Sequence, residues 1–157
     1  MVITSSHNNW KSEKYKQISI SGNRGKDAGY EGLCYPLFAP KIGFWKEWHN
    51  NIGKIDEEEN NKFYIRKYYE QVLCELDPSE TLKDVDNSVL LCYEPNNEFC
   101  HRHIVSAWLE LTTGVETIEA KCDEFDKLEV LDRPEYIKEY LSEVMGLDKT
   151  DTHVLEK

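Results

Sequence analysis

The sequence predicts a single α/β domain in which helices flank a layered, mostly parallel sheet. The run "SVLLCYE" at residues 88–94 is almost continuously apolar and has the length of a strand, which is typical of a strand covered on both faces in the middle of a parallel sheet. The segment that follows carries four apolar residues on one helical stripe that can pack on such a sheet, namely Ile104, Ala107, Trp108 and Leu111. Strand-like and helical segments alternate over 157 residues, a length that suits one domain with its own core.

The first part of the chain predicts two strands and a long loop. The runs "VITSS" at residues 2–6 and "QISIS" at residues 17–21 have the β-branched or alternating pattern of strands, and polar or glycine-rich residues follow each of them. Residues 21–40 then contain four glycines and two prolines, too many for a regular element. A loop of that length in a compact domain is often a binding loop.

Helices are predicted over residues 41–50 and 57–77, the second led by acidic residues that suit its dipole and ended by Pro78. Four apolar side chains of the second helix recur at helical spacing and should share its buried face: Ile65, Tyr69, Val72 and Leu76. A short acidic helix or turn precedes the buried strand. Gly114 is suited to ending the helix after that strand.

The C-terminal part predicts a last strand over residues 115–120 and a helix over residues 133–146, with Pro134 near its first turn. The remaining tail, residues 147–157, is polar and is expected to fray.

The charge and composition exclude several classes of protein. The net charge of -11 disfavours a broad nucleic-acid surface, since such binding depends on neutralising phosphates. No apolar run reaches the length of a membrane span, and the N-terminus "MVITSSHNNW" lacks the pattern of a signal peptide, so we expect a cytoplasmic protein. The five cysteines are odd in number and form no CxxC pair, which predicts reduced thiols.

Polar side chains cluster at the carboxyl ends of the predicted strands, where parallel sheets bind their ligands. Three segments far apart in sequence should therefore converge on one rim. The predicted ligand-binding residues are Ser5, Ser6, His7, Asn23, Arg24, Tyr93, Glu94 and Arg102.

Cys100 and His101 are the candidate catalytic residues. A thiol at the start of a helix, beside Arg102 and two imidazoles, is favoured as a thiolate nucleophile. Against this, Cys100 lies four residues before Ile104 and so on the apolar stripe, which favours a small core residue shielded near Trp108. Of His101 and His103, one could act as an acid or base and the other as a core or capping residue.

Arg102 lies off the apolar stripe, so it is expected to reach outward and could hold a phosphate or carboxylate. A structural salt bridge, for example to Glu94 or Glu98, is the equal alternative. Arg24, in the glycine-flanked "SGNRGK", is the second candidate cation. The alternative is that this segment is only a surface turn with no role in binding. We expect His7, Arg24 and Arg102 to open onto one cavity.

No metal site is predicted, because the candidate ligands match no established zinc spacing: Cys100, His103, His7 and Glu94. No cofactor can be named, since the sequence contains no Walker loop, dinucleotide fingerprint or Ser-His-Asp motif. The aromatic cluster of Phe44, Trp45 and Trp48 is typical of core packing, although a tryptophan near the rim could stack on a base.

The stretch "LLCYEPNNEFCHRHIVSAWL" resembles the signature of the domain of unknown function 488 family, in which a hydrophobic strand leads into Cys-His-Arg and a helix. The resemblance extends from residue 2 to about residue 112 and includes "ITSSHNN", "QISISGNRG", "YPLFAPKIGFWKEW" and "FYIRKYYEQVLCELD". It implies a small domain of Rossmann-like layering with a pocket at the polar strand ends. Phe38 interrupts the family's Leu-Ala-Pro segment, so the loop before the first helix could differ in shape.

Two functions follow from these observations. The leading hypothesis is an enzyme-like domain that binds a small anionic ligand, a nucleotide or a nucleic-acid-derived molecule, at the strand rim and acts as a transferase or hydrolase. The alternative is a non-catalytic acidic protein that engages a basic protein partner, as the net charge of -11 favours.

Overall fold

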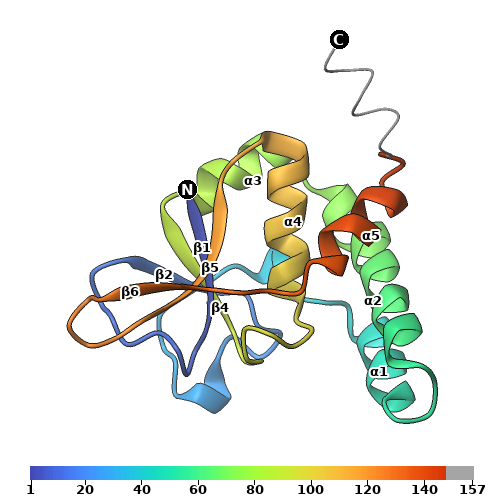
Figure 1. Cartoon of the computed structure of the whole chain (residues 1–157), viewed down its shortest axis with the longest axis horizontal. Helices are drawn as coiled ribbons and strands as arrows, with labels where there is room; N and C mark the ends of the chain where they lie inside the picture. Colours follow the sequence, from blue (N-terminus) through green and yellow to red (C-terminus); the bar gives the residue numbers. More distant parts are fainter. Residues whose placement is uncertain (148–157) are drawn as a thin grey trace.

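The computed structural model describes residues 1–147, which form one α/β domain built on a six-stranded sheet (Figure 1). The strands lie in the order β3-β2-β4-β1-β5-β6. All neighbouring pairs are parallel except β5 and β6, which are antiparallel. Their bounds are β1 Val2–Ser6, β2 Lys16–Ser19, β3 Leu33–Cys34, β4 Ser88–Cys92, β5 Thr117–Cys122 and β6 Leu128–Leu131. The predicted fold class, α/β with a mostly parallel sheet, is confirmed.

Five α-helices occur in the described residues: α1 Ile42–Asn51, α2 Glu57–Gln71, α3 Pro78–Val85, α4 His101–Thr113 and α5 Tyr136–Val144. In Figure 1, α4 lies between the sheet and the pair α2 and α5, and it contacts β1, β4 and β5 on one side and α5 on the other. None of these helices is long and apolar enough to cross a bilayer.

The central strand β4 is covered on both faces of the sheet, as its apolar sequence predicts. All of its residues are buried. Leu90 and Cys92 point into the larger core beneath the helices, whereas Val89 and Leu91 point into a smaller core that contains no residue of the α-helices. Cys92 therefore lies on the side of the sheet that α4 covers, because side chains alternate along a strand.

The predicted helix over residues 57–77 is interrupted. Asp56 caps α2 by accepting a hydrogen bond from the Glu59 amide, but α2 ends at Gln71 and the 3-10 turn η3 (Leu73–Glu75) follows. Pro78 does not end this helix; it occupies the first turn of α3, where its missing N–H costs nothing. The predicted face is only partly right, since Ile65 and Val72 are buried but Tyr69 and Leu76 are half-buried. The most enclosed face also carries Asn60, Asn61, Tyr64 and Tyr68.

The loop between β2 and α1 contains two 3-10 turns, η1 (Lys26–Ala28) and η2 (Pro36–Phe38). Phe38, the residue that departs from the family pattern, is fully buried, and its carbonyl accepts a hydrogen bond of 2.5 Å from the Tyr68 hydroxyl. The phenylalanine side chain therefore fills the core, while the backbone at this position joins the loop to α2.

The C-terminal region adds an element that the sequence did not predict. After β5, the chain turns through Asp126, at a φ of 64°, into the antiparallel edge strand β6. Gly114 ends α4 at a φ of 75°, as predicted. The helix predicted over residues 133–146 is α5, and nearly all of the tail expected to fray, residues 148–157, lies outside the described residues.

The burial of Trp108 predicts a large loss of stability on truncation. The side chain is 2% exposed in the larger core, so Trp108→Ala should lower the free energy of unfolding by about 3–5 kcal/mol in urea denaturation. Phe125→Ala is the control, because Phe125 is 82% exposed and should change stability by about 0.5 kcal/mol or less. A Trp108→Ala protein as stable as the control would contradict the described core.

Candidate functional site

A cavity of about 610 Å³, which we call the rim cavity, opens beyond the carboxyl ends of β2 and β4. Its sides come from the β2–α1 loop, from α1 and α2, and from the segment between β4 and α4. The location is that expected for a parallel sheet, where successive strands end at the same edge and lead into helix N-termini.

One side of the rim cavity is an aromatic wall, formed by Trp45, Trp48, Tyr64 and Phe99. The rings hold one another by edge contacts: Tyr64 meets Phe99 with centroids 5.1 Å apart and Trp48 with centroids 5.3 Å apart. The Trp48 indole N–H donates to the Asn61 side-chain oxygen at 3.0 Å, which fixes the ring. A wall of this kind suits a planar, apolar group of a ligand.

The floor of the rim cavity is a cluster of Cys92, Cys100 and His101, in which the ligand atoms of all three side chains lie within 4.8 Å of one another. Cys92 ends β4, and Cys100 is the N-cap of α4, so two rigid elements hold the cluster. His101 Nε2 lies 2.7 Å from the carbonyl oxygen of Ile20. Because that oxygen can only accept, Nε2 carries the hydrogen, and Nδ1 presents its lone pair toward Cys92 Sγ at 3.7 Å.

Burial controls the protonation of this cluster. It raises the pKa of Cys100 well above its ordinary value, the neighbouring Cys92 thiol adds to the shift, and the charge of Arg102 opposes it. Burial works to lower the pKa of His101, but its hydrogen bonds with Cys100 and the Ile20 carbonyl and the negative charge of Glu94 raise it, so the net shift is upward. Cys100 is therefore a neutral thiol at rest, 3% exposed, and the thiolate expected from the helix dipole is disfavoured.

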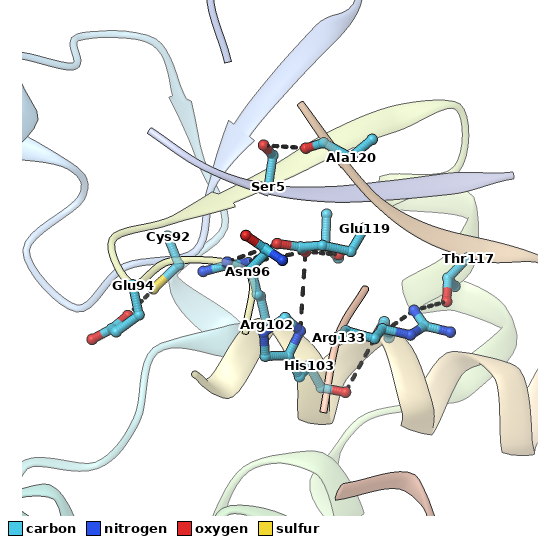
Figure 2. Close-up of polar contacts among 12 residues, drawn as sticks. Ser5, Cys92, Glu94, Asn96, Arg102, His103, Thr117, Glu119, Ala120 and Arg133 are labelled. Carbon is cyan, nitrogen blue, oxygen red and sulfur yellow. Dashed lines mark hydrogen bonds and ion pairs between the residues drawn. The ribbon is translucent and has the colours of Figure 1, made fainter. Parts of the chain in front are cut away.

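The outer edge of the rim cavity is polar and partly ordered. The Tyr93 hydroxyl donates to Asn23 Oδ1 at 2.6 Å and accepts from the Asp27 amide at 3.1 Å, which joins the end of β4 to the long loop. Cys92 Sγ lies 3.7 Å from Glu94 Oε2 (Figure 2). Of the predicted ligand-binding residues, Asn23, Tyr93 and Glu94 thus line the cavity, together with the catalytic candidates Cys100 and His101.

Arg102 does not reach outward, and that expectation is wrong. Its side chain is fully buried and forms a forked ion pair with Glu119 of β5, with Nη2 at 2.8 Å from Oε2 and Nε at 3.1 Å from Oε1 (Figure 2). Thr4 of β1 donates to Glu119 Oε1 at 2.6 Å. Residues 101–109 of α4 are buried without interruption, so the side of the helix off the apolar stripe faces the sheet rather than solvent. The salt-bridge interpretation of Arg102 is right, but its partner is Glu119.

The remaining predicted ligand-binding residues also lie outside the rim cavity. Ser5 donates to the Ala120 carbonyl at 2.6 Å, and the Ser6 hydroxyl accepts from the Asn9 amide at 3.1 Å. His7 packs between the rings of Tyr30 and Tyr93, and burial, with the charge of Arg102, lowers its pKa. Arg24 is exposed on the loop at a φ of 64°.

The prediction that His7, Arg24 and Arg102 open onto one cavity is therefore wrong. Arg102 has no exposed surface with which to line a cavity, and neither His7 nor Arg24 lines the rim cavity. The strands that precede these residues in the chain, β1, β2 and β4, do end at one edge, but the three side chains do not converge there.

Two features of the site were missed or undervalued from the sequence. Cys92 was treated only as part of the buried strand, although it is the last residue of that strand and directly precedes the predicted ligand-binding residues Tyr93 and Glu94. The aromatic wall mixes residues from three segments, and only their convergence in space makes it a surface. His103 was considered as a zinc ligand, but its Nδ1 lies 4.0 Å from Glu119 Oε1, beside the buried ion pair.

Removing Arg102 should destabilise the fold. Arg102→Ala leaves the Glu119 carboxylate buried and unpaired, which should lower the free energy of unfolding by about 3–5 kcal/mol in urea denaturation. The double variant Arg102→Met with Glu119→Gln removes both charges and should recover much of that loss. An Arg102→Ala protein that unfolds at the wild-type urea concentration would contradict a structural role for the pair.

The burial of His103 predicts a loss of stability in acid. Burial, with the charges of Arg102 and Arg133, lowers the pKa of His103 to about 3, whereas the pKa in the unfolded chain is about 6.5. As the pH falls below about 6.5, only the unfolded chain takes up this proton, so stability should fall by up to about 1.4 kcal/mol per pH unit, down to the folded pKa. His103→Leu should have a shallower dependence between pH 6.5 and pH 5; identical slopes would show that His103 is protonated in the folded protein.

Comparisons with known proteins place this geometry in a family. A family model described as the active DUF488-N3 subclade matches residues 11–113. No curated protein and no solved structure matches the chain. The matched segment runs from before β2 to the end of α4 and contains every residue that lines the rim cavity, whereas Glu119, the partner of Arg102, lies beyond it. This chain belongs to the DUF488 family, within its active DUF488-N3 subclade.

Proposed function

We propose that this protein is a hydrolase or transferase that binds a nucleotide-type ligand, with a planar ring and an anionic group, in the rim cavity. The observation that carries the proposal is the position of the Cys92, Cys100 and His101 cluster at the floor of a cavity with an aromatic wall. Convergent polar groups and titrating side chains in an otherwise apolar pocket are the usual mark of an active site.

The aromatic wall supports a ring in the ligand. Trp45 and Trp48 of α1 are half-buried, so part of each ring remains accessible from the cavity. Stacking on aromatic side chains stabilises a bound base by about 1–3 kcal/mol and tolerates any base, because every base has a π-face. Tyr93 and Asn23 at the outer edge offer hydrogen bonds to polar groups of the ring or of a sugar, as does the buried Ser21 hydroxyl, which has no hydrogen-bond partner among the described residues.

The start of α4 supports a single anionic group rather than a highly charged one. Among the described residues, the lining of the rim cavity contains no lysine or arginine, while Asp27 and Glu94 are acidic. An anion can instead meet the N-terminus of α4, a helix of 13 residues whose N-cap Cys100 makes no side-chain capping bond. One phosphate or carboxylate fits this arrangement.

The floor of the cavity supplies the chemistry. His101 is oriented by its hydrogen bond to Ile20, so Nδ1 can accept a proton from a thiol or a water that attacks the ligand. The description of the subclade as active supports a catalytic role over the alternative of an acidic interaction protein.

The test measures the melting temperature of the chelator-treated protein with a mononucleotide of each base. Nucleosides, which lack the phosphate, and ribose 5-phosphate, which lacks the base, are measured separately. A ligand that binds the folded state stabilises it by about 2.7 kcal/mol at one hundred times its Kd, which is about 5–10 °C for a domain of this size. Trp45→Ala should abolish the shift, since it removes part of the wall.

Phe125→Ala is the matched control for that experiment, because it removes an exposed aromatic ring that does not line the rim cavity. It should keep the full shift. Failure of every mononucleotide, combined with a salt-sensitive complex with a basic protein, would instead favour the interaction protein.

A further inference from the structure

We propose that Cys92, Cys100 and His101 form a binding site for a zinc ion whose fourth coordination position opens into the rim cavity. The inference rests on the proposed function in that it uses the same cavity, and it deepens it by naming the group that acts on the ligand. It departs from the sequence-based prediction of no metal site, because that prediction considered Cys100, His103, His7 and Glu94 and left out Cys92.

The distances between the ligand atoms suit a tetrahedral ion. Zinc binds thiolate sulfur at about 2.3 Å and imidazole nitrogen at about 2.0–2.1 Å, so two ligands on a tetrahedron are about 3.6–3.8 Å apart. Cys92 Sγ and His101 Nδ1 are 3.7 Å apart, and the three ligand atoms all lie within 4.8 Å of one another. Bringing atoms at the 4.8 Å limit to that spacing requires an adjustment of about 1 Å.

His101 is held as metal-binding histidines usually are. Such a histidine donates its second ring N–H to a carbonyl or carboxylate, which fixes the tautomer and aims the other nitrogen at the ion. In this structure Nε2 donates to the Ile20 carbonyl at 2.7 Å, and Nδ1 faces the thiols. The ring also lies 5.8 Å from that of Tyr68, so its orientation is set from two sides.

The cluster is buried yet faces the cavity. Cys92 and Cys100 are each 3% exposed and His101 is 7% exposed, but all three line the rim cavity. Structural zinc sites are closed by four protein ligands, whereas catalytic sites have three and leave one position for water or substrate. Three protein ligands with an open cavity above them match the catalytic class.

Glu94 lies beside the cluster, with Oε2 at 3.7 Å from Cys92 Sγ, and lines the same cavity. A carboxylate there can accept a proton from a water bound in the fourth position. The ion would therefore select hydrolysis over thiol-dependent transfer as the reaction of the proposed function.

The test is titration of the reduced, metal-free protein with Co²⁺, followed by displacement with Zn²⁺. The expected result is one equivalent of Co²⁺ with thiolate-to-cobalt charge-transfer absorption and the visible bands of a tetrahedral site, both lost when Zn²⁺ is added. Absence of the charge-transfer absorption in the wild-type protein would overturn the proposal, whatever the variants do.

Variants assign the ligands. Cys92→Ser, Cys100→Ser and His101→Asn should each weaken Co²⁺ binding by at least the 10- to 100-fold that loss of an outer-shell partner costs. The matched control replaces the other three cysteines, Cys34→Ser, Cys74→Ser and Cys122→Ala, and leaves the cluster intact. It should keep the full absorption; loss of the absorption in this control would place the metal elsewhere and overturn the proposal.

The two proposals fail separately. Nucleotide stabilisation is measured on chelator-treated protein and depends on the aromatic wall, so it does not require the ion. A protein that binds mononucleotides but not Co²⁺ keeps the proposed function and loses the metal site, and the reverse result keeps the metal site alone.

Discussion

The ion pair between Arg102 and Glu119 is the interaction on which the arrangement of the domain depends. It joins the first turn of α4 to the middle of β5, and Thr4 of β1 closes the network through Glu119. A buried pair of this kind is sustained only when the geometry is good and further hydrogen bonds satisfy the charges. Because the pair tolerates little displacement, it determines where the N-terminus of α4 sits over the sheet.

The rim cavity follows from that placement. Parallel strands β2 and β4 end side by side, and α4 begins directly above their ends. Cys92 projects toward α4 because it alternates with Leu91 along β4, and it therefore meets Cys100 and His101 at the start of the helix. The floor of the site thus consists of one strand end and one helix start held in register by a contact that lies outside the site.

The electrostatics of the cavity also derive from this pair. The Arg102 guanidinium, which was predicted from the sequence to bind a ligand, is neutralised by Glu119 and buried away from solvent. What remains for an anion is the helix terminus, which suits one negative group, while the aromatic wall suits a ring. The net charge of -11 repels ligands that carry several negative charges, so recognition of an anion depends on these local groups.

The sequence by itself determined most of the elements, though not β6 or the break after α2, and the edge of the sheet at which the site lies. The apolar run of β4, the stripe of α4 and the cap at Gly114 are local patterns, set by backbone periodicity and by the short-range demands of helix ends. Even part of the site, from Tyr93 to His101, was predictable because strand ends and helix starts are local features. The direction of Arg102 was not, since it depends on Glu119, 17 residues away in strand β5, and on the burial of the first nine residues of α4 from all sides. Only the tertiary structure decided which polar side chains neutralise one another in the core and which face the cavity, because burial and pairing are properties of neighbours in space rather than in sequence.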